Sequence, residues 1–397
     1  MTPSDERWLL PEGIEELLPP QAARMERLRR TILDLYHGWG YELVLPPFIE
    51  YLETLLTGTG NDLDLQTFKL TDQLSGRMMG VRADMTPQVA RIDACHLRRE
   101  TPTRLCYMGT VLRTRPAGIT GSRSPLQVGV ELYGHDGVAS DVEVLRLMVE
   151  TMAVSGIERL HLDLGHVGIF RALARQADLD GRQESALFDA LQRKARPEIE
   201  SLLGQLGLPS GISRMLTSLA TLNGGEEILD QAERTLQEGT SELHAALTNL
   251  REVARQLRSH LPELALHFDL AELRGYRYHT GVVFAVYVPG HGQAVAQGGR
   301  YDDIGRVFGR SRPATGFSTD LKTLVSLAPG EGEPRRKGIL APAGTSPDLL
   351  QAVRELRGQG ERVIELLPGQ SGDAAALDCD RHLVLRDGGW QVESLSG

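Results

Sequence analysis

A long stretch in the middle of this chain, residues 169–260, has the residue pattern of packed helices. Proline is scarce there, and charged residues alternate with Leu, Ala and Ile at helical spacing. We therefore predict an all-helical insertion of about four or five helices. Because strand-like segments lie on both sides of it, the pattern argues against a regular alternation of strands and helices.

The two flanking parts hold strands that come in runs joined by short turns. Helices are predicted at residues 20–39 and 141–155, where apolar residues recur every three or four positions. The separation of helices from strands favours a mostly antiparallel sheet with helices on one side, a fold of the α+β class. The segments with strand character are Tyr41–Leu45, Met78–Val81, Arg104–Arg113, Leu126–Tyr133, Leu160–Leu164, Leu264–Phe268 and Val282–Val288.

A chain of 397 residues is too long for one ordinary domain, and changes of pattern suggest where to divide it. Residues 1–168 and 261–328 read as two parts of one core, interrupted by the helical insertion at 169–260. A loop-like linker, Pro329–Pro334, precedes a small α/β domain at 335–397. In this domain we expect a strand, a helix, a second strand and a hairpin, at Gly338–Ala341, Asp348–Arg357, Val363–Leu366 and around Asp387–Gly389.

Composition argues against several classes of protein. The net charge of −10 gives no overall basic footprint for nucleic acid, and no apolar run approaches the ~18–20 residues of a membrane helix. No secretory signal is visible, so we expect a cytoplasmic protein. Three cysteines without C-x-x-C spacing argue against a disulfide framework or a cysteine zinc site. Phosphate-loop and metalloprotease motifs are absent as well, and we expect neither cofactor nor metal.

Polar residues gather in four segments that otherwise look like strands and turns. Spacing of two places Gln127, Gly129 and Glu131 on one face of a strand. The glycine between two polar side chains leaves room for a ligand to lie against the backbone. Ordinary exposed strand positions are the alternative reading of any one of these residues. The four segments are Val81–Gln88, Tyr107–Glu131, Leu273–Gly281 and Gly298–Asp302.

The side chains in these segments suit a small zwitterion. The oxygens of Asp84, Gln127 and Glu131 could accept from an ammonium group or an imidazole N–H. Arg113 and Arg274 could hold a carboxylate. The sequence therefore points to a site for a small molecule that carries a positive and a negative charge.

The same segments resemble motifs of histidyl-tRNA synthetase, a class II aminoacyl-tRNA synthetase. The resemblance spans roughly residues 8–328 and implies a synthetase-like core made of residues 1–168 and 261–328. The matching segments are Gly38–Glu50 for the dimerisation motif, Arg82–Thr86 for R-P-E-x-T, Tyr107–Glu131 for the second class motif, Arg274–Gly281 for R-G-x-x-Y-Y-x-x and Gly298–Asp302 for G-G-R-Y-D.

This resemblance also implies a set of residues around a bound histidine. His279 replaces the second tyrosine of the family's motif, so the resemblance does not fix its role. The residues that map onto the histidine site are Asp84, Thr86, Arg113, Gln127, Glu131, Arg274, Tyr278 and His279.

The chain departs from the synthetase pattern where ATP is held. Arg115 stands where the family has a glutamate that contacts adenine, and a guanidinium cannot accept a hydrogen bond from an adenine amine. In the third motif, Thr323 occupies the place of the arginine that clamps the phosphates, and Asp320 adds a negative charge nearby. Adenylate formation needs cations against the phosphates, so ATP activation is not expected.

A histidine pocket without ATP machinery resembles the ATP phosphoribosyltransferase regulatory subunit, a synthetase paralogue. The resemblance implies a non-catalytic subunit that supports the first step of histidine biosynthesis and passes on feedback inhibition by histidine. It implies a short-form catalytic subunit as partner and a homodimeric core within a hetero-oligomer. Composition and charge give no reason to expect a membrane or a nucleic acid as partner. A divergent histidyl-tRNA synthetase, a stand-alone histidine-binding or RNA-binding module, and an amino-acid-modifying enzyme remain the alternatives.

Overall fold

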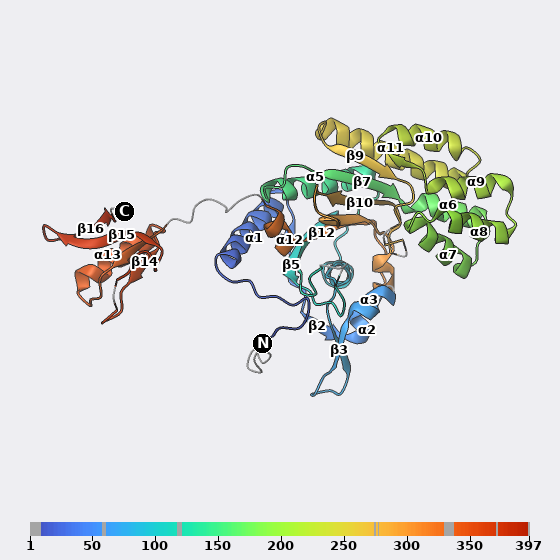
Figure 1. The fold of residues 1–397 in the computed structure, drawn as a ribbon. Helices are drawn as coiled ribbons and strands as arrows, with labels where there is room; N and C mark the ends of the chain where they lie inside the picture. The colour runs from blue at the N-terminus through green and yellow to red at the C-terminus, as the bar shows by residue number, and fades with distance from the viewer. Residues whose placement is uncertain are drawn as a thin grey trace. The chain divides into compact units, whose positions relative to one another are not determined.

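The computed structural model describes residues 9–57, 61–116, 121–273, 275–276, 278–328, 337–370 and 372–395. Contacts within the chain separate it into two compact units, Met1–Ala328 and Pro329–Gly397. Each unit has its own hydrophobic core. Figure 1 colours both units by residue number, with the first unit running from blue to orange and the second in red.

Among the described residues, a sheet of nine strands forms the centre of the first unit, in the order β1-β5-β6-β12-β11-β10-β7-β9-β8. Its neighbours are antiparallel except β1 with β5 and β7 with β9. The prediction of a mostly antiparallel sheet in an α+β fold is confirmed. The strands are β1 (Glu42–Leu43), β5 (Thr103–Thr110), β6 (Leu126–Tyr133), β7 (His161–His166), β8 (Asn223–Gly224), β9 (Ala265–Asp269), β10 (Val282–Tyr287), β11 (Ala296–Arg300) and β12 (Ala314–Asp320).

The two faces of this sheet differ in chemistry, and β6 shows why. Val128, Val130 and Leu132 are buried in the main hydrophobic core, where helix α5 (Val138–Val154) contacts β6, β11 and β12. Since side chains alternate along a strand, Gln127 and Glu131 point to the opposite face. One face of the sheet is therefore covered by helices, and the other is left for polar side chains.

The helices predicted at residues 20–39 and 141–155 are both present. The N-terminal helix α1 (Gln21–Gly38) contacts α5 and the short helix α12 (Leu321–Leu327). Tyr36 of α1 meets Phe317 of β12 edge to face, with ring centroids 6.3 Å apart. This contact ties the N-terminal helix to the middle of the sheet.

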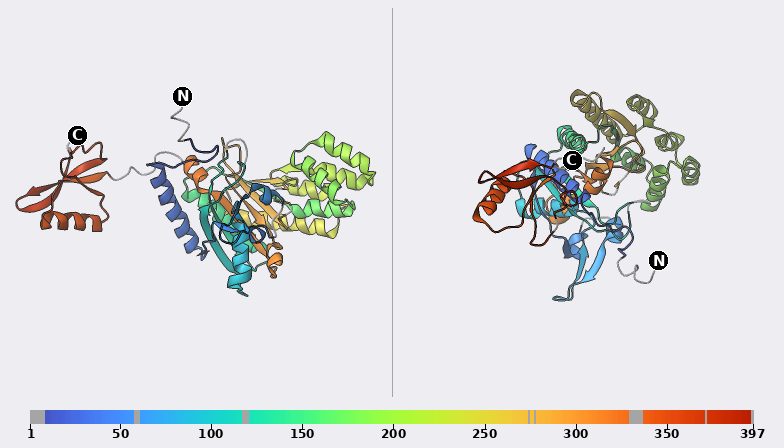
Figure 2. Two further views of the ribbon diagram at one scale, coloured as in Figure 1. Left: turned by 90° about the horizontal axis from the view of Figure 1, so that it is seen from below. Right: turned by 60° about the vertical axis from the view of Figure 1, so that its left-hand side comes forward.

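The stretch 169–260 contains more helices than expected. Six helices run through it, and the two-residue strand β8 adds an edge to the large sheet beside β9. The count differs because Gly207, in the left-handed region at φ 61°, and Pro209 interrupt what reads as one helical pattern. These helices gather at one end of the first unit in both views of Figure 2. They are α6 (Val167–Gln176), α7 (Gly181–Gln192), α8 (Arg196–Leu206), α9 (Ser210–Leu219), α10 (Glu227–Thr235) and α11 (Ser241–His260).

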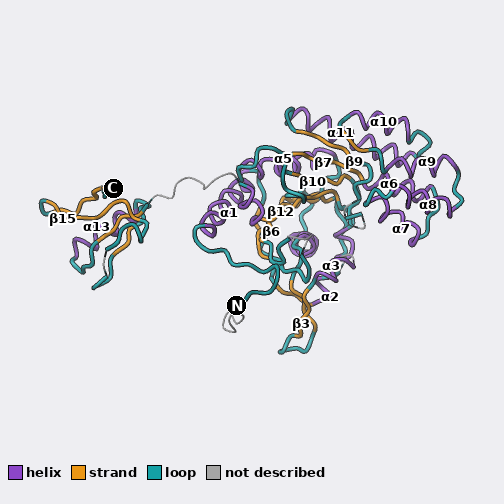
Figure 3. Tube along the Cα trace, in the orientation of Figure 1, coloured by secondary structure: helices purple, strands orange, loops and turns teal. Residues whose placement is uncertain are grey.

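A second, three-stranded sheet was only partly expected. Its order is β2-β4-β3, with β2 at Ile49–Tyr51, β3 at Phe68–Thr71 and β4 at Met78–Val81. Only β4 was predicted, because β2 has three residues and little alternation. Figure 3 shows the hairpin of β3 and β4 extending away from the large sheet. The neighbouring helices are α2 (Leu52–Leu55), α3 (Asn61–Gln66), α4 (Thr86–Arg91), the π-helix Ile92–Leu97 and the 3-10 helix Ile304–Phe308.

The second unit contains the predicted elements. Its sheet has the order β14-β13-β15-β16, and Ile339, Val353 and Leu383 belong to its core. Positive φ angles at Asp387 (49°) and Gly388 (80°) suit the tight turn between β15 and β16. The elements are β13 (Gly338–Ala341), α13 (Pro347–Gly358), β14 (Val363–Glu365), β15 (Cys379–Arg386) and β16 (Gly389–Ser394). In the described parts of both units, no helix has the length and apolar character that crossing a membrane requires.

Candidate functional site

Two adjoining cavities open on the polar face of the large sheet. The larger has a volume of about 900 Å³ and the smaller about 210 Å³, and Gln297 and Ser318 line both. The predicted Arg113 and Gln127 line the larger cavity. Arg274 lies outside the described residues. The other predicted residues line the smaller cavity, namely Asp84, Thr86, Glu131, Tyr278 and His279.

Gln127 connects the two cavities through its side chain. Its Nε2 donates to Asp84 Oδ1 at 2.8 Å, and its Oε1 accepts from the Met85 backbone N–H at 3.0 Å. Asp84 lies after β4 and Gln127 lies at the start of β6, so this amide joins the small sheet to the large one. The carboxylate of Asp84 is thereby held at the edge of the smaller cavity.

Glu131 is the buried acid of the smaller cavity. Its Oε1 accepts from the Tyr107 hydroxyl at 3.0 Å, and its Oε2 has no hydrogen-bond partner among the described residues. Burial holds the pKa of this carboxyl well above its usual range, and the neighbouring hydroxyls of Thr86 and Tyr107 oppose the effect. A buried acceptor without a partner is costly unless a ligand satisfies it. Glu131 is therefore placed to receive a donor from a bound molecule.

Gly316 of β12 makes room for this carboxyl. A Cβ at position 316 would lie 1.8 Å from Glu131 Oε2 and 2.5 Å from the Val130 carbonyl oxygen. Only glycine fits opposite Glu131, because the register of β12 against β6 pairs the two residues directly.

The role expected for Gly129 is wrong. We expected it to leave room for a ligand, but a Cβ there would lie 2.6 Å from the Tyr107 hydroxyl oxygen and 2.5 Å from the Phe317 carbonyl oxygen. The space above Gly129 is therefore filled by the phenol of Tyr107, its partner across the β5–β6 pair. Spacing along β6 alone could not reveal which neighbour takes the space.

Aromatic side chains close the smaller cavity. The Tyr278 hydroxyl is buried without a hydrogen-bond partner among the described residues. The ring of Tyr278 stacks on that of Tyr301, with the ring centroids 5.0 Å apart. His279 Nδ1 lies 3.3 Å from the Arg300 carbonyl oxygen. Burial lowers the pKa of His279 to about 4, so its ring is neutral near pH 7. A carbonyl only accepts, hence the ring hydrogen is on Nδ1 and Nε2 is a hydrogen-bond acceptor.

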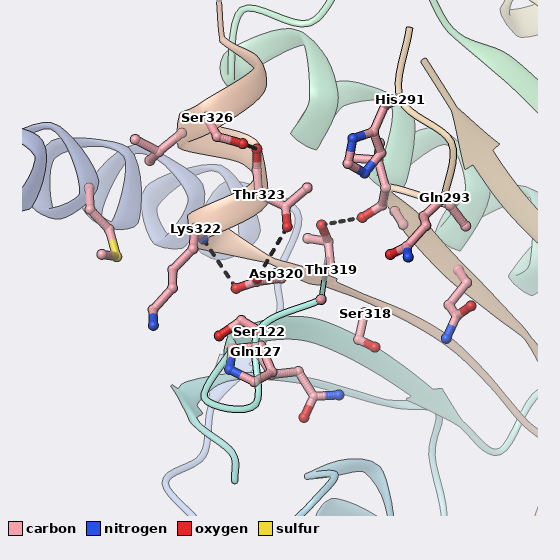
Figure 4. Close-up of a pocket in the computed structure, with 18 of the residues that line it drawn as sticks. Ser122, Gln127, His291, Gln293, Ser318, Thr319, Asp320, Lys322, Thr323 and Ser326 are labelled. Carbon is pink, nitrogen blue, oxygen red and sulfur yellow. Dashed lines mark hydrogen bonds between the residues drawn. The ribbon is translucent and has the colours of Figure 1, made fainter. Parts of the chain in front are cut away.

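In the larger cavity, the Asp320 side chain caps helix α12 (Figure 4). Its Oδ1 accepts from the backbone N–H groups of Lys322 at 3.1 Å and Leu126 at 2.9 Å, and its Oδ2 accepts from the Thr323 hydroxyl at 3.1 Å. Burial raises the pKa of Asp320, while these donors oppose the effect. The position that resemblance assigns to a phosphate-binding arginine thus carries a hydroxyl bonded to a carboxylate.

Cations around the larger cavity are engaged with protein groups. Lys322 Nζ lies 3.3 Å from Glu15 Oε1 and 3.3 Å from Ser124 Oγ. Arg24 donates to the Ala328 carbonyl oxygen at 2.8 Å, and Arg113 Nε donates to the Ala83 carbonyl oxygen at 3.3 Å. Arg115 is exposed and does not belong to the described lining.

Arg300, in the fourth polar segment, serves the scaffold. Its guanidinium is buried, with Nη2 3.0 Å from Asp141 Oδ1 and 2.8 Å from Ser140 Oγ. These bonds fix β11 to the first turn of α5, on the helix side of the sheet. The sequence did not single out Gln297, which lines both cavities, or Tyr107, which lies in an apolar run along β5 and looks there like an ordinary core residue.

Comparisons with known proteins match both units of the chain. The family model described as Histidyl-tRNA synthetase matches residues 13–324, and the one described as ATP phosphoribosyltransferase subunit HisZ C-terminal domain matches residues 336–393. A protein of Thioalkalivibrio sulfidiphilus named ATP phosphoribosyltransferase regulatory subunit is 63% identical over 384 residues, covering 97% of each chain. One of the same name from Alkalilimnicola ehrlichii is 61% identical over 389 residues, covering 98% of this chain and 97% of that one.

Solved structures agree with these matches. An ATP phosphoribosyltransferase regulatory subunit/histidyl-tRNA synthetase from Bacillus halodurans superposes with a TM-score of 0.82 at 28% identity, over 93% of this chain and 95% of that one. Histidyl-tRNA synthetase from Nostoc sp. PCC 7120 gives a TM-score of 0.77 at 20% identity, over 95% of this chain and 91% of that one, and shows the shared fold. The chain belongs to the family of ATP phosphoribosyltransferase regulatory subunits.

Proposed function

We propose that this chain is the non-catalytic regulatory subunit of an ATP phosphoribosyltransferase. In this role it supports the first step of L-histidine biosynthesis and carries feedback inhibition by histidine. Its partner is a short-form catalytic subunit, and its place of action is the cytoplasm. Relatives at 61% and 63% identity with that name, together with the matching C-terminal family model, support this assignment.

One observation carries the proposal, namely the contrast between the two cavities. The smaller has buried oxygens on Glu131 and Tyr278 that find no hydrogen-bond partner among the described residues, and a ligand with hydrogen-bond donors would satisfy them. In the larger, Thr323 and Asp320 bond to each other where a nucleotide clamp would need a cation. A protein with this pair of cavities binds an amino acid and does not activate it.

Histidine is the effector we assign to the smaller cavity. Asp84 and Glu131 suit an ammonium group or an imidazole N–H, and Tyr278 offers a hydroxyl. Arg274 is assigned to the carboxylate, together with Arg113 from the adjoining larger cavity. Regulation requires that histidine bind more tightly to one state of the assembly than to the other. A tenfold difference in affinity corresponds to about 1.4 kcal/mol of coupling, within reach of one or two charge-assisted hydrogen bonds.

A homodimeric core fits the surface around β1. Leu43, Leu45, Phe48 and Ile49 are exposed, with Leu45 75% exposed in the single chain. They lie in the segment that resembles the synthetase dimerisation motif, which runs from β1 at an edge of the large sheet to β2 at an edge of the small one. An apolar cluster at a sheet edge is costly in water unless another chain covers it. We assign this surface to a second copy and the larger assembly to contacts with the catalytic subunit.

Reconstitution with the short-form catalytic subunit tests the proposal. We expect ATP phosphoribosyltransferase activity to require this chain and to fall when histidine is added. Glu131→Gln should keep the activation but raise the histidine concentration for half inhibition about tenfold or more, because a bond to an ionised group is lost. Glu150→Gln is the matched control, since Glu150 accepts from Trp39 at 2.9 Å and lines neither cavity. Activity that is independent of this chain contradicts the proposed role.

A further inference from the structure

Tyr107 does not line the smaller cavity, but its hydroxyl contacts two side chains that do. The side chain is fully buried, and its hydroxyl lies 3.1 Å from Thr86 Oγ1 and 3.0 Å from Glu131 Oε1. Both partners line the cavity. Gly129 provides the space for the phenol, since any Cβ there would lie 2.6 Å from the hydroxyl oxygen.

The direction of these two hydrogen bonds follows from the chemistry of Glu131. A cationic ligand in the cavity opposes the effect of burial on Glu131 and favours its ionised form, and a carboxylate can only accept. The single hydrogen of the Tyr107 hydroxyl then goes to Glu131 Oε1. Because the phenol has no second hydrogen, Thr86 is the donor in its contact with Tyr107, and the same hydroxyl also interacts with the Glu131 carboxyl. The bonds therefore run from Thr86 to Tyr107 to Glu131.

This direction sets the polarity of the cavity wall. With its own hydrogen directed to Tyr107 and Glu131, Thr86 offers only lone pairs to a ligand. Glu131, held through Oε1, keeps Oε2 for the ligand, and Gly316 leaves the space that this oxygen needs. Two cavity positions are thus acceptors through one buried phenol, so the wall favours ligand groups that donate hydrogen bonds, such as ammonium and imidazole N–H.

We propose that Tyr107 is a positioning residue that orients Glu131 and Thr86 as hydrogen-bond acceptors for the bound amino acid. The proposal rests on the proposed function, in that the ligand is taken to be histidine. Removal of the hydroxyl leaves Glu131 free to rotate and Thr86 free to turn its hydrogen toward the ligand.

Calorimetric titration of the full chain with L-histidine tests this role. We expect Tyr107→Phe to weaken histidine binding about tenfold or more, the size of one hydrogen bond to an ionised group. Tyr36→Phe is the matched control, because Tyr36 is also a fully buried phenol, bonded to Thr151 at 3.4 Å outside both cavities. It should bind histidine within about twofold of the unmodified chain, since no cavity residue is changed.

A double-mutant cycle separates positioning from general damage. If Tyr107 acts through Glu131, adding Tyr107→Phe to Glu131→Gln should cause little further loss, whereas independent effects would multiply. Thr86→Val tests the same bonds from the other end if Tyr107→Phe folds poorly. Unchanged affinity in Tyr107→Phe, or multiplied losses in the double variant, overturns the positioning role alone. An unmodified chain that binds no histidine overturns the histidine assignment and this inference together.

Discussion

Replacement of Asp320 by alanine directly perturbs the larger cavity, beside the position where Thr323 stands in place of the phosphate-binding arginine of the synthetase motif. This carboxylate caps α12 through the Lys322 backbone N–H, receives the Thr323 hydroxyl and anchors the Leu126 backbone N–H at the start of β6. Losing the cap costs about 1 kcal/mol. The half-buried Leu126 N–H, left without its acceptor, adds about 1–2 kcal/mol. We predict that Asp320→Ala lowers the free energy of unfolding by about 2–3 kcal/mol.

Urea unfolding measures this change. Trp39 lies between α1 and α5, where it donates to Glu150 at 2.9 Å, so its fluorescence reports on the first unit when Trp8 and Trp390 are replaced by phenylalanine. Asp320→Asn keeps an oxygen acceptor and should lose less than about 1 kcal/mol. Histidine affinity should survive Asp320→Ala, because Asp320 lines only the larger cavity. A loss below about 0.5 kcal/mol refutes the structural role of Asp320, and a loss of histidine binding refutes the separation of the two cavities.

Three further predictions concern other parts of the fold. His166 accepts from the Gly168 N–H at 3.1 Å, and burial lowers the pKa of His166 to about 4. Protonation therefore favours the unfolded chain, and the free energy of unfolding should fall as the pH drops from about 6.5 toward 4. The urea midpoint should show this dependence on pH, and His166→Asn should reduce it. Gly129→Ala should cost about 1–3 kcal/mol in urea unfolding, because the Phe317 carbonyl oxygen cannot retreat from a Cβ at 2.5 Å, whereas Gly181→Ala, with nothing within 4 Å, should leave the midpoint nearly unchanged. A chain ending at Ala328 should fold and bind histidine within about twofold of the full chain in calorimetry, since each unit has its own core; failure to fold would show that the second unit supports the first.

The sequence predicted the elements whose patterns are long and regular. Leu126–Tyr133 was placed to the residue, because alternating apolar and polar side chains mark one buried and one polar face. The same alternation placed Gln127 and Glu131 together on the polar face. In the second unit, Asp387 and Gly388 marked the hairpin, since an Asp-Gly pair tolerates the positive φ angles that such a turn requires.

What the sequence could not show depends on contacts between distant segments. Ile49–Tyr51 is too short to carry a pattern, and it becomes a strand only by pairing with β4. Tyr107 reads as one apolar residue of β5, and its hydroxyl gains meaning only when β6 brings Glu131 beside it. Asp320 reads as an added negative charge, yet its bond to the Leu126 N–H, far away in sequence, gives it a structural role. Hydrogen bonds of this kind follow from the register of strands, which composition and spacing do not give.

The central claim is that the smaller cavity binds an amino acid, whereas the larger cavity does not bind ATP because Thr323 replaces the phosphate-binding arginine. Calorimetric titration of the full chain with histidine, in the presence and in the absence of ATP and Mg²⁺, tests both halves at once. We predict that histidine binds with the same affinity and heat in both titrations, and that ATP alone gives no binding heat. Saturable heat from ATP, or a histidine affinity that changes when ATP is present, would contradict the claim.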